Sequence, residues 1–297
     1  MNAKTTLINV VLLLSVVGIC HAAQETKKSC PVDADSAGIP VIKYLWYGFE
    51  TLGISPGTEG KISIDIATTV QSKFLWHGID LLDDHGVVIP SVGVKFGDSG
   101  FSGRVIKGYP LSKDMSNLQD HHYALFYSGA LLKDTPYATN VVANYFYYGK
   151  PELAQRKNDS QEIGTTFFWP RAFHLGNGCI TPSYYLGYIW PSRSVSNLRG
   201  SEGFIHVFGL AYDFEVPSFW PSGDKQDFKF FGDLTYNDGF AGAAIEHDWS
   251  HILLGLSTDI NKGNFTFTPF VNYQISMEDT VNDEDEFLCG LSTTYRF

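Results

Sequence analysis

Apolar and polar residues alternate along most of the chain from residue 60 onward. The clearest stretch is "KISIDIATTVQSKFLWHG" (61–78), and "NFTFTPFVNYQISM" (264–277) repeats it. Alternation with period two is typical of β-strands. In the first stretch, one face carries the following residues: Ile62, Ile64, Ile66, Thr68, Val70, Ser72, Phe74 and Trp76. Ten further strands are predicted at about 87–97, 101–110, 121–133, 137–148, 160–172, 179–192, 203–216, 227–237, 247–260 and 284–297, which brings the total to twelve.

The connections between these strands alternate in length. Short turns such as "GDSG", "KDTP" and "NKGN" carry the Gly, Asn, Asp and Pro that tight turns favour, and longer polar links separate them. The link around "VPSFWPSGDKQ" departs from this alternation. Outer-membrane barrels have short periplasmic turns and longer outer loops. We therefore predict an all-β fold, a transmembrane antiparallel up-and-down β-barrel of about twelve strands, in preference to a secreted soluble β protein.

The last strand, "FLCGLSTTYRF", remains alternating to its final residue. Phe287, Leu291, Tyr295 and Phe297 share its apolar face. In lipid every backbone group needs an internal partner, so this strand is expected to pair with the first one. The aromatic terminus resembles the signal by which outer-membrane proteins are recognised for insertion, which makes the barrel-assembly machinery an expected partner. Aromatic residues near strand ends predict interfacial girdles: Trp76, Tyr109, Tyr148, Trp169, Trp190 and Trp249.

The residues before the first strand divide into two segments. Lys4, the apolar run "LINVVLLLSVVGIC" and the small residues of "CHAAQ" predict a signal peptide over 1–23, cleaved after Ala22 or Ala23. Residues 24–59 form an N-terminal extension in which "GIPVIKYLWYGFETLGI" has helical spacing. That segment is either a short amphipathic helix, at the membrane interface or plugging a barrel end, or an irregular leader. The barrel takes 60–297, and the expected location is a Gram-negative outer membrane.

Composition narrows the partners and cofactors. The formal net charge of -11 offers no basic stripe for nucleic acid. After signal cleavage Cys30, Cys179 and Cys289 remain, which allows one disulfide without indicating the pair. No cofactor is expected, and no motif predicts a metal site built on cysteines. The expected partners are outer-membrane lipid, lipopolysaccharide and small hydrophilic solutes.

One stretch resembles a known family. "TVQSKFLWHGIDLLDDHGVVIPSVGV" (69–94) is similar to the opening hairpin of TorF-type porins, in which a strand ends in Ser-x-aromatic-x-aromatic-Arg-Gly. Here Ser72, Phe74, Trp76 and Gly78 match, and His77 stands in place of the usual Arg. The segments "HVFGLAYDFEVP", "YNDGF" and "VNDEDEF" resemble outer-membrane proteins of the same plan. The resemblance implies a barrel, and more loosely a porin, without assigning a role to any residue.

Two kinds of segment invite a chemical interpretation. "HDWSH" (247–251) contains serine and histidine, but on a regular strand Ser250 and His251 point to opposite faces and cannot share a proton. A lipid hydrolase would need one of these histidines against a serine. "MEDTVNDEDE" (277–286) and the residues Asp80, Asp83, Asp84 and His85 predict two acidic loops on the outer side. Such loops either bind divalent cations or are simply solvated.

Strand parity predicts which polar side chains point inward. The pore-lining set is Asp65, Gln71, Lys73, His77, Arg104, Lys229, Asp233, Glu286 and Arg296. Charges of both signs suit either a water-filled pore or an interior crossed by salt bridges. Twelve strands predict a narrow passage. The favoured function is a narrow passive, porin-like channel for ions or small hydrophilic solutes, not an enzyme. The alternative is a non-transporting structural or adhesive protein that acts through its acidic outer loops.

Overall fold

The structure is a computed structural model that describes residues 62–297, except 117, 134, 136, 151–158, 171–172, 177, 193–201, 218–224 and 241–246. All secondary structure in this part of the chain is β. No helix in it is long and apolar enough to cross a membrane. The predicted signal peptide and N-terminal extension lie outside the described residues.

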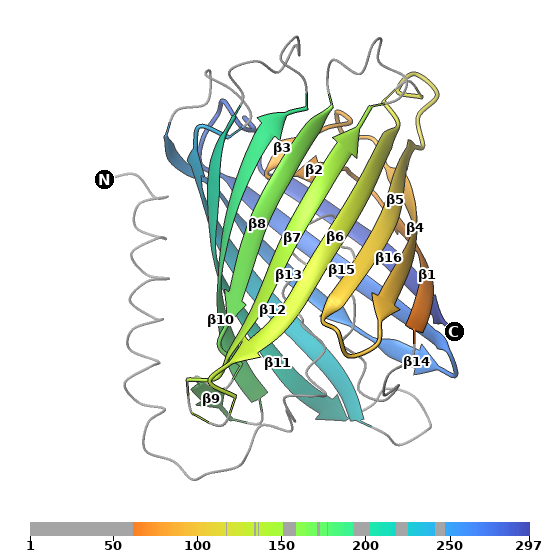
Figure 1. Cartoon of the computed structure of the whole chain (residues 1–297). Helices are drawn as coiled ribbons and strands as arrows, with labels where there is room; N and C mark the ends of the chain where they lie inside the picture. Colours follow the sequence, from red (N-terminus) through yellow and green to blue (C-terminus); the bar gives the residue numbers. More distant parts are fainter. Residues whose placement is uncertain are drawn as a thin grey trace.

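Twelve strands form the wall of a barrel (Figure 1), as the sequence predicts. They are β1 (Ile62–Gln71), β4 (Val87–Phe96), β5 (Phe101–Pro110), β6 (Asp120–Leu131), β7 (Thr139–Gly149), β8 (Ser160–Phe168), β10 (Gly178–Pro191), β11 (Gly203–Pro217), β12 (Lys225–Asp238), β13 (Asp248–Thr258), β15 (Phe265–Ser276) and β16 (Glu286–Arg296). Two short strands extend the wall at its edge: β9 (Phe173–Leu175) pairs with β10, and β14 (Ile260–Lys262) pairs with β15.

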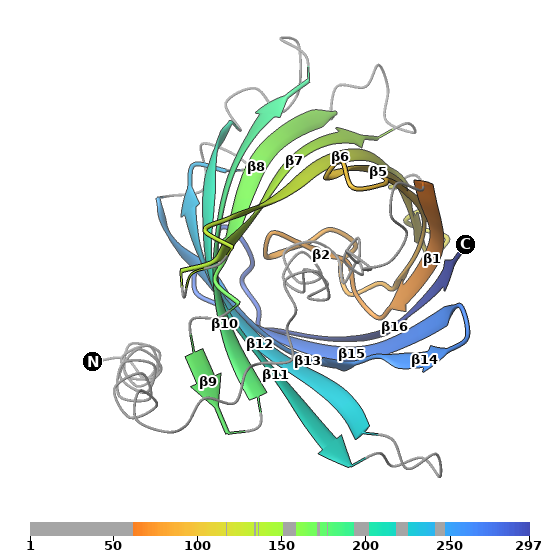
Figure 2. The same ribbon diagram turned by 60° about the horizontal axis from the view of Figure 1, so that its bottom comes forward.

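The barrel is closed by its first and last strands. Each wall strand pairs antiparallel with its neighbours in sequence, and β1 pairs antiparallel with β16, with Ile66 opposite Tyr295 and Val70 opposite Leu291. Seen obliquely from the lower end of Figure 1, the strands form a ring (Figure 2), and the space that this ring encloses is called the lumen. Closure gives each of the twelve wall strands a partner on both sides, which is the condition for a sheet in lipid.

The outer face of the wall is apolar. In β1 the isoleucines are exposed while Ala67, Thr69 and Gln71 are buried on the other face. The same alternation holds in the last strand, where Phe287, Leu291 and Phe297 are exposed as predicted. Further exposed apolar side chains from the other strands are Val92, Val105, Leu125, Ile163, Phe208, Leu210, Phe230, Leu256 and Val271. Hydrophobic burial inside a globule cannot account for this face, because it points away from the lumen.

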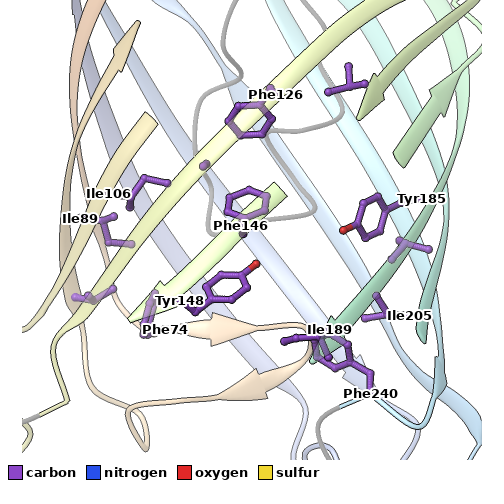
Figure 3. Packing of buried hydrophobic residues seen from close by; sticks show 14 of the residues in the cluster. Phe74, Ile89, Ile106, Phe126, Phe146, Tyr148, Tyr185, Ile189, Ile205 and Phe240 are labelled. Atoms are coloured by element: carbon purple, nitrogen blue, oxygen red, sulfur yellow. The ribbon is translucent and has the colours of Figure 1, made fainter. Parts of the chain in front are cut away.

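The inner face is not polar throughout. Hydroxyl and amide side chains cover the inner face of β15, β16 and β1, among them Thr69, Thr268 and Ser292. An apolar cluster covers much of the inner face from β4 to β11 (Figure 3). Its members include Ile89, Ile106, Phe126, Val142, Phe146, Tyr148, Phe168, Tyr185, Ile189, Ile205 and Val207. The pore-lining residues predicted from strand parity are all polar, so the apolar cluster is an additional feature of the inner wall.

The link between β1 and β4 explains this feature. The predicted first strand ends at Gln71, and residues 72–86 turn into the lumen, where β2 (Leu75–Trp76) and β3 (Ile79–Asp80) form a two-stranded hairpin (Figure 2). Phe74 and Trp76 therefore do not continue the lipid-facing row. Phe74 is buried in the apolar cluster, and Trp76 packs against it. The assignment of Trp76 and Tyr148 to the aromatic girdles was wrong, because both side chains pack inside the barrel.

The described residues include two cysteines, Cys179 and Cys289. Cys289 is free and exposed on the outer face of β16. Cys179, at the start of β10, is disulfide-bonded. Cys289 is therefore not the partner of Cys179.

A charge on the outer face should destabilise the barrel according to its depth. Leu210 is 44% exposed in the middle of β11. We expect Leu210→Arg to lower the free energy of unfolding by about 2–4 kcal/mol, because the guanidinium would face the bilayer midplane. Urea unfolding in lipid vesicles measures this. Leu131→Arg, at the end of β6, is the matched control and should cost about 0–1 kcal/mol. Equal costs at both positions would contradict a membrane-facing exterior.

Candidate functional site

The hairpin in the lumen ends in a tight two-residue turn. Leu75 pairs with Asp80 and Trp76 with Ile79, so His77 and Gly78 form the turn. Both have positive φ, 50° at His77 and 91° at Gly78. Positive φ at both central residues is the type I′ geometry that matches the twist of a β-hairpin. The sequence reads as a continuing strand here, but the His-Gly pair is a turn signal.

The turn contacts several strands of the wall. Gln274 of β15 donates a hydrogen bond from Nε2 to the Gly78 carbonyl oxygen over 2.7 Å. The ring of His251, on β13, packs so close to Gly78 that a Cβ at residue 78 would overlap it. On β8, Glu162 Oε2 lies 3.5 Å from His77 Nε2. The hairpin therefore spans the lumen and is held at its tip from more than one side.

Aromatic packing fixes the body of the hairpin. The Trp76 indole contacts the Tyr148 ring edge-on, with 5.6 Å between the ring centroids. It also contacts the Phe240 ring, which is tilted against it, with 5.2 Å between the centroids. Phe74 and Leu82 are buried in the same cluster, and Figure 3 shows Phe74 and Tyr148 beside the hairpin. Each fully buried apolar side chain of this size contributes about 1.5–3 kcal/mol. The apolar patch inside the barrel thus serves as the seat of the hairpin.

At its base the hairpin is tied to the last strand by charge. Lys73 Nζ forms ion pairs with Glu286 at the start of β16 and with Asp84 in its own link. Burial alone would lower the pKa of Lys73, but hydrogen bonds to Asp84 and Glu286 outweigh it and raise this pKa above its usual range. Lys73 therefore remains charged and paired at any physiological pH.

The two predicted acidic loops meet at this point. Carboxylate oxygens of Asp80, Asp84 and Glu286 lie within 4.8 Å of one another, a spacing that could hold a metal ion. The Lys73 ammonium already pairs with two of these three carboxylates. Since a fixed cation is present among them, the cluster is explained as an ion-pair network. The first loop is also not simply solvated, because Leu82 is buried.

Glu162 is the most deeply buried charge near the hairpin. It is fully buried, accepts a hydrogen bond from Tyr148 Oη at 2.9 Å and another from Tyr185 Oη, and faces His77. Charge-assisted bonds of this kind are stronger than neutral ones. Sequence reasoning passed over Glu162, although in "SQEIGTTFF" it lies directly before the exposed Ile163, so strand parity marks it as an inward-facing charge.

The expectation that Ser250 and His251 cannot meet was wrong. Their side chains share a hydrogen bond of 2.9 Å between Oγ and Nδ1, and both are buried on the inner side. A β-bulge is the reason: Thr235 pairs with His251 and Tyr236 with Trp249, which leaves Ser250 as the extra residue. The other ring nitrogen of His251 faces the Thr235 hydroxyl at 3.3 Å, not a carboxylate. The pair packs against Gly78 of the hairpin and faces away from lipid, an arrangement that does not suit a lipid hydrolase.

The predicted pore-lining residues fall into three groups. Asp65, Gln71, Arg104, Asp233 and Glu286 lie on wall strands with their side chains on the inner face. Lys73 and His77 belong to the hairpin, so they lie inside the barrel for a different reason from strand parity. The third group consists of the two remaining residues. Lys229 forms an ion pair with Asp213 at 3.1 Å, and Arg296 is exposed at the end of β16, where its Nη1 lies 3.5 Å from Thr266 Oγ1.

Inward-facing glycines let large side chains lie flat on the wall. A Cβ at Gly164 or Gly187 would overlap Tyr185, and one at Gly93 would overlap the ion pair of Asp65 and Arg104. These groups therefore run along the wall and do not project toward the axis. Arg104 is held there by a second bond, which its Nη1 donates to Ser91 Oγ over 2.7 Å.

A closed antiparallel barrel with an apolar exterior and charged groups inside has one physical setting, a lipid bilayer. This is the fold of a Gram-negative outer-membrane β-barrel. No protein-family model matches the sequence, and the search of curated proteins finds no significant relative.

The solved structures to which the chain is similar include three outer-membrane proteins. The NanC porin has a TM-score of 0.47 and 10% identity, over 78% of this chain and 98% of that one. For the KdgM porin the TM-score is 0.44 with 9% identity, over 79% and 99%. The COG4313 outer membrane channel from Pseudomonas putida F1 gives 0.43 and 10%, over 81% and 97%. At these values the similarity says nothing about substrate.

The seat of the hairpin can be tested at Gly78. Gly78→Ala should release residues 72–86 from the lumen, because the added methyl overlaps His251 at a residue with positive φ. Limited proteolysis of the purified barrel should then cut within this link. Gly263→Ala is the matched control, since Gly263 also has positive φ (61°) but nothing lies within 4 Å of its Cβ position. Cleavage in both variants alike would mean that backbone strain, not the contact with His251, causes the effect.

Proposed function

We propose that this protein is a narrow passive channel of the outer membrane, porin-like, for ions or small hydrophilic solutes. The observation that carries the proposal is the contrast between the two faces of the closed wall. The exterior is apolar, whereas the interior holds the ion pair of Asp65 and Arg104 and a strip of hydroxyls. Buried polar groups on an inner wall have no use in packing against lipid, but they suit the passage of hydrated solutes.

One polar part of the inner wall is a strip of hydroxyl side chains. It crosses β15, β16 and β1, where Thr69 Oγ1 donates to Ser292 Oγ over 3.1 Å. Its members are Thr69, Thr266, Thr268, Ser292 and Thr294, with Ser91 on the next strand. The aromatic seat of the hairpin lies on the other wall, β4 to β11. Solutes would pass between the hairpin and the polar parts of the inner wall, with the hairpin restricting the width.

The finer assignments belong to the same proposal. Ser72, Phe74, Trp76 and Gly78 support membership of the TorF-type porins, although His77 departs from that pattern. An N-terminal signal peptide ending at residue 23 would export the chain. The barrel-assembly machinery would insert it through its aromatic last strand, and lipopolysaccharide would surround its outer rim.

A second candidate is a barrel that transports nothing and works as a structural or adhesive protein through its outer loops. The hairpin supports this second candidate, because it connects several strands of the wall across the lumen. It contacts Glu162, His251, Gln274 and Glu286. A brace of this kind would stiffen a scaffold as well as it would narrow a channel.

Conductance in a planar bilayer separates the two candidates. The purified native barrel should give small discrete steps, and a variant in which residues 74–82 are replaced by a short Gly/Ser linker should give larger ones. The reason is that the linker removes Phe74, Trp76 and Leu82 from the lumen while the wall remains intact. A native barrel that inserts but stays silent would overturn the channel. Silence of the linker variant as well would establish a scaffold.

A further inference from the structure

Most charged side chains inside the described part of the barrel have a partner of opposite sign. Arg104 pairs with Asp65, Lys73 with Glu286, and Lys229 with Asp213. At the start of β6, Asp120 lies 2.6 Å from Lys150 Nζ. Charges paired in this way cancel at short range, so they contribute little net field to the lumen.

Asp233 of β12 is different. The residue is only 6% exposed, and its Oδ2 is buried without a hydrogen-bond partner among the described residues. The same part of the chain contains no Lys, Arg or His within ion-pair distance of it. A buried carboxylate oxygen without a partner is rare and costly, and it points to a bound ion or water.

The surroundings of Asp233 supply a second oxygen. Ser183 of β10, Gly209 of β11 and Asp233 lie side by side across three neighbouring strands. A Cβ at Gly209 would overlap both Ser183 Oγ and Asp233 Oδ1, so the two oxygens converge over the bare glycine. A side chain at residue 209 would separate them. Carboxylate and hydroxyl oxygens are the ligands that hard cations prefer.

We propose that Asp233 and Ser183 form a cation-binding position over Gly209 and give the channel its preference for small cations over anions. This inference rests on the proposed channel function and deepens it. An uncompensated carboxylate in a narrow lumen with low-dielectric walls attracts cations and repels anions. The bound cation also offsets the cost of burying the charge of Asp233.

Reversal potentials across a bilayer with a potassium chloride gradient test the proposal. The native channel should pass potassium in preference to chloride, Asp233→Asn should bring the two permeabilities close to equal, and Asp233→Glu should retain most of the preference. Asp283→Asn is the matched control, because it removes the same charge from an exposed position in the outer link 277–285. It should leave the reversal potential unchanged.

The failures of the two proposals can be told apart. The reversal potential of each variant is also measured with Gly78→Ala added, because this substitution weakens the packing of the hairpin against His251. Steps with a reversal potential that Asp233→Asn does not move would overturn the cation site and keep the channel. The absence of steps in every background would overturn the channel itself. Ser183→Ala gives a further check, since loss of the second oxygen should reduce the potassium preference, and an unchanged preference would exclude Ser183 from the position.

Discussion

Backbone hydrogen bonding in lipid is the constraint on which the rest of this structure depends. A strand edge exposed to hydrocarbon would leave a row of peptide groups without partners, at several kcal/mol each. The chain avoids this by pairing β1 with β16, and the pairing continues to the last residue, where the Phe297 amide donates to the Ile64 carbonyl oxygen over 3.0 Å. Closure of the wall creates an enclosed lumen. How that lumen is filled then becomes a separate packing problem.

The hairpin 72–86 is the solution to part of that problem. A soluble domain buries its apolar residues in one core, but this chain has to place apolar groups on two surfaces with opposite roles. The outer one carries the exposed apolar side chains and faces lipid. The inner one, around Phe146, Tyr148 and Phe240, receives the hairpin through Trp76. The sequence cannot show whether Trp76 faces lipid or the inside of the barrel, because tryptophan is common in both places. The path of the chain after Gln71 decides this.

Buried charge inside the barrel follows the same logic. Glu162 is stabilised by two tyrosine hydroxyls, and Arg104 by Asp65 and Ser91, so each can remain inside at low cost. Glycines opposite these groups make room for them to lie along the wall. Asp233 lacks such compensation among the described residues, and the lumen is the region in which a mobile ion could supply it. In the proposed channel, this arrangement would link the stability of the wall to the selectivity of the passage.

The sequence by itself determined the wall. Lipid and lumen lie on opposite sides of every strand, so each of the twelve strands must alternate, and the alternation can be read without knowing any contact. The inward direction of Asp65, Gln71, Arg104 and Asp233 follows from the same rule. Other features depended on the tertiary structure. The hairpin lies in the link between β1 and β4, and strand alternation does not say where a link runs. The contact between Ser250 and His251 needs a bulge. The ion pair of Lys73 and Glu286 joins residues from opposite ends of the barrel sequence. Alternation fixes which face a side chain occupies, but register, bulges and loop paths decide what it meets there.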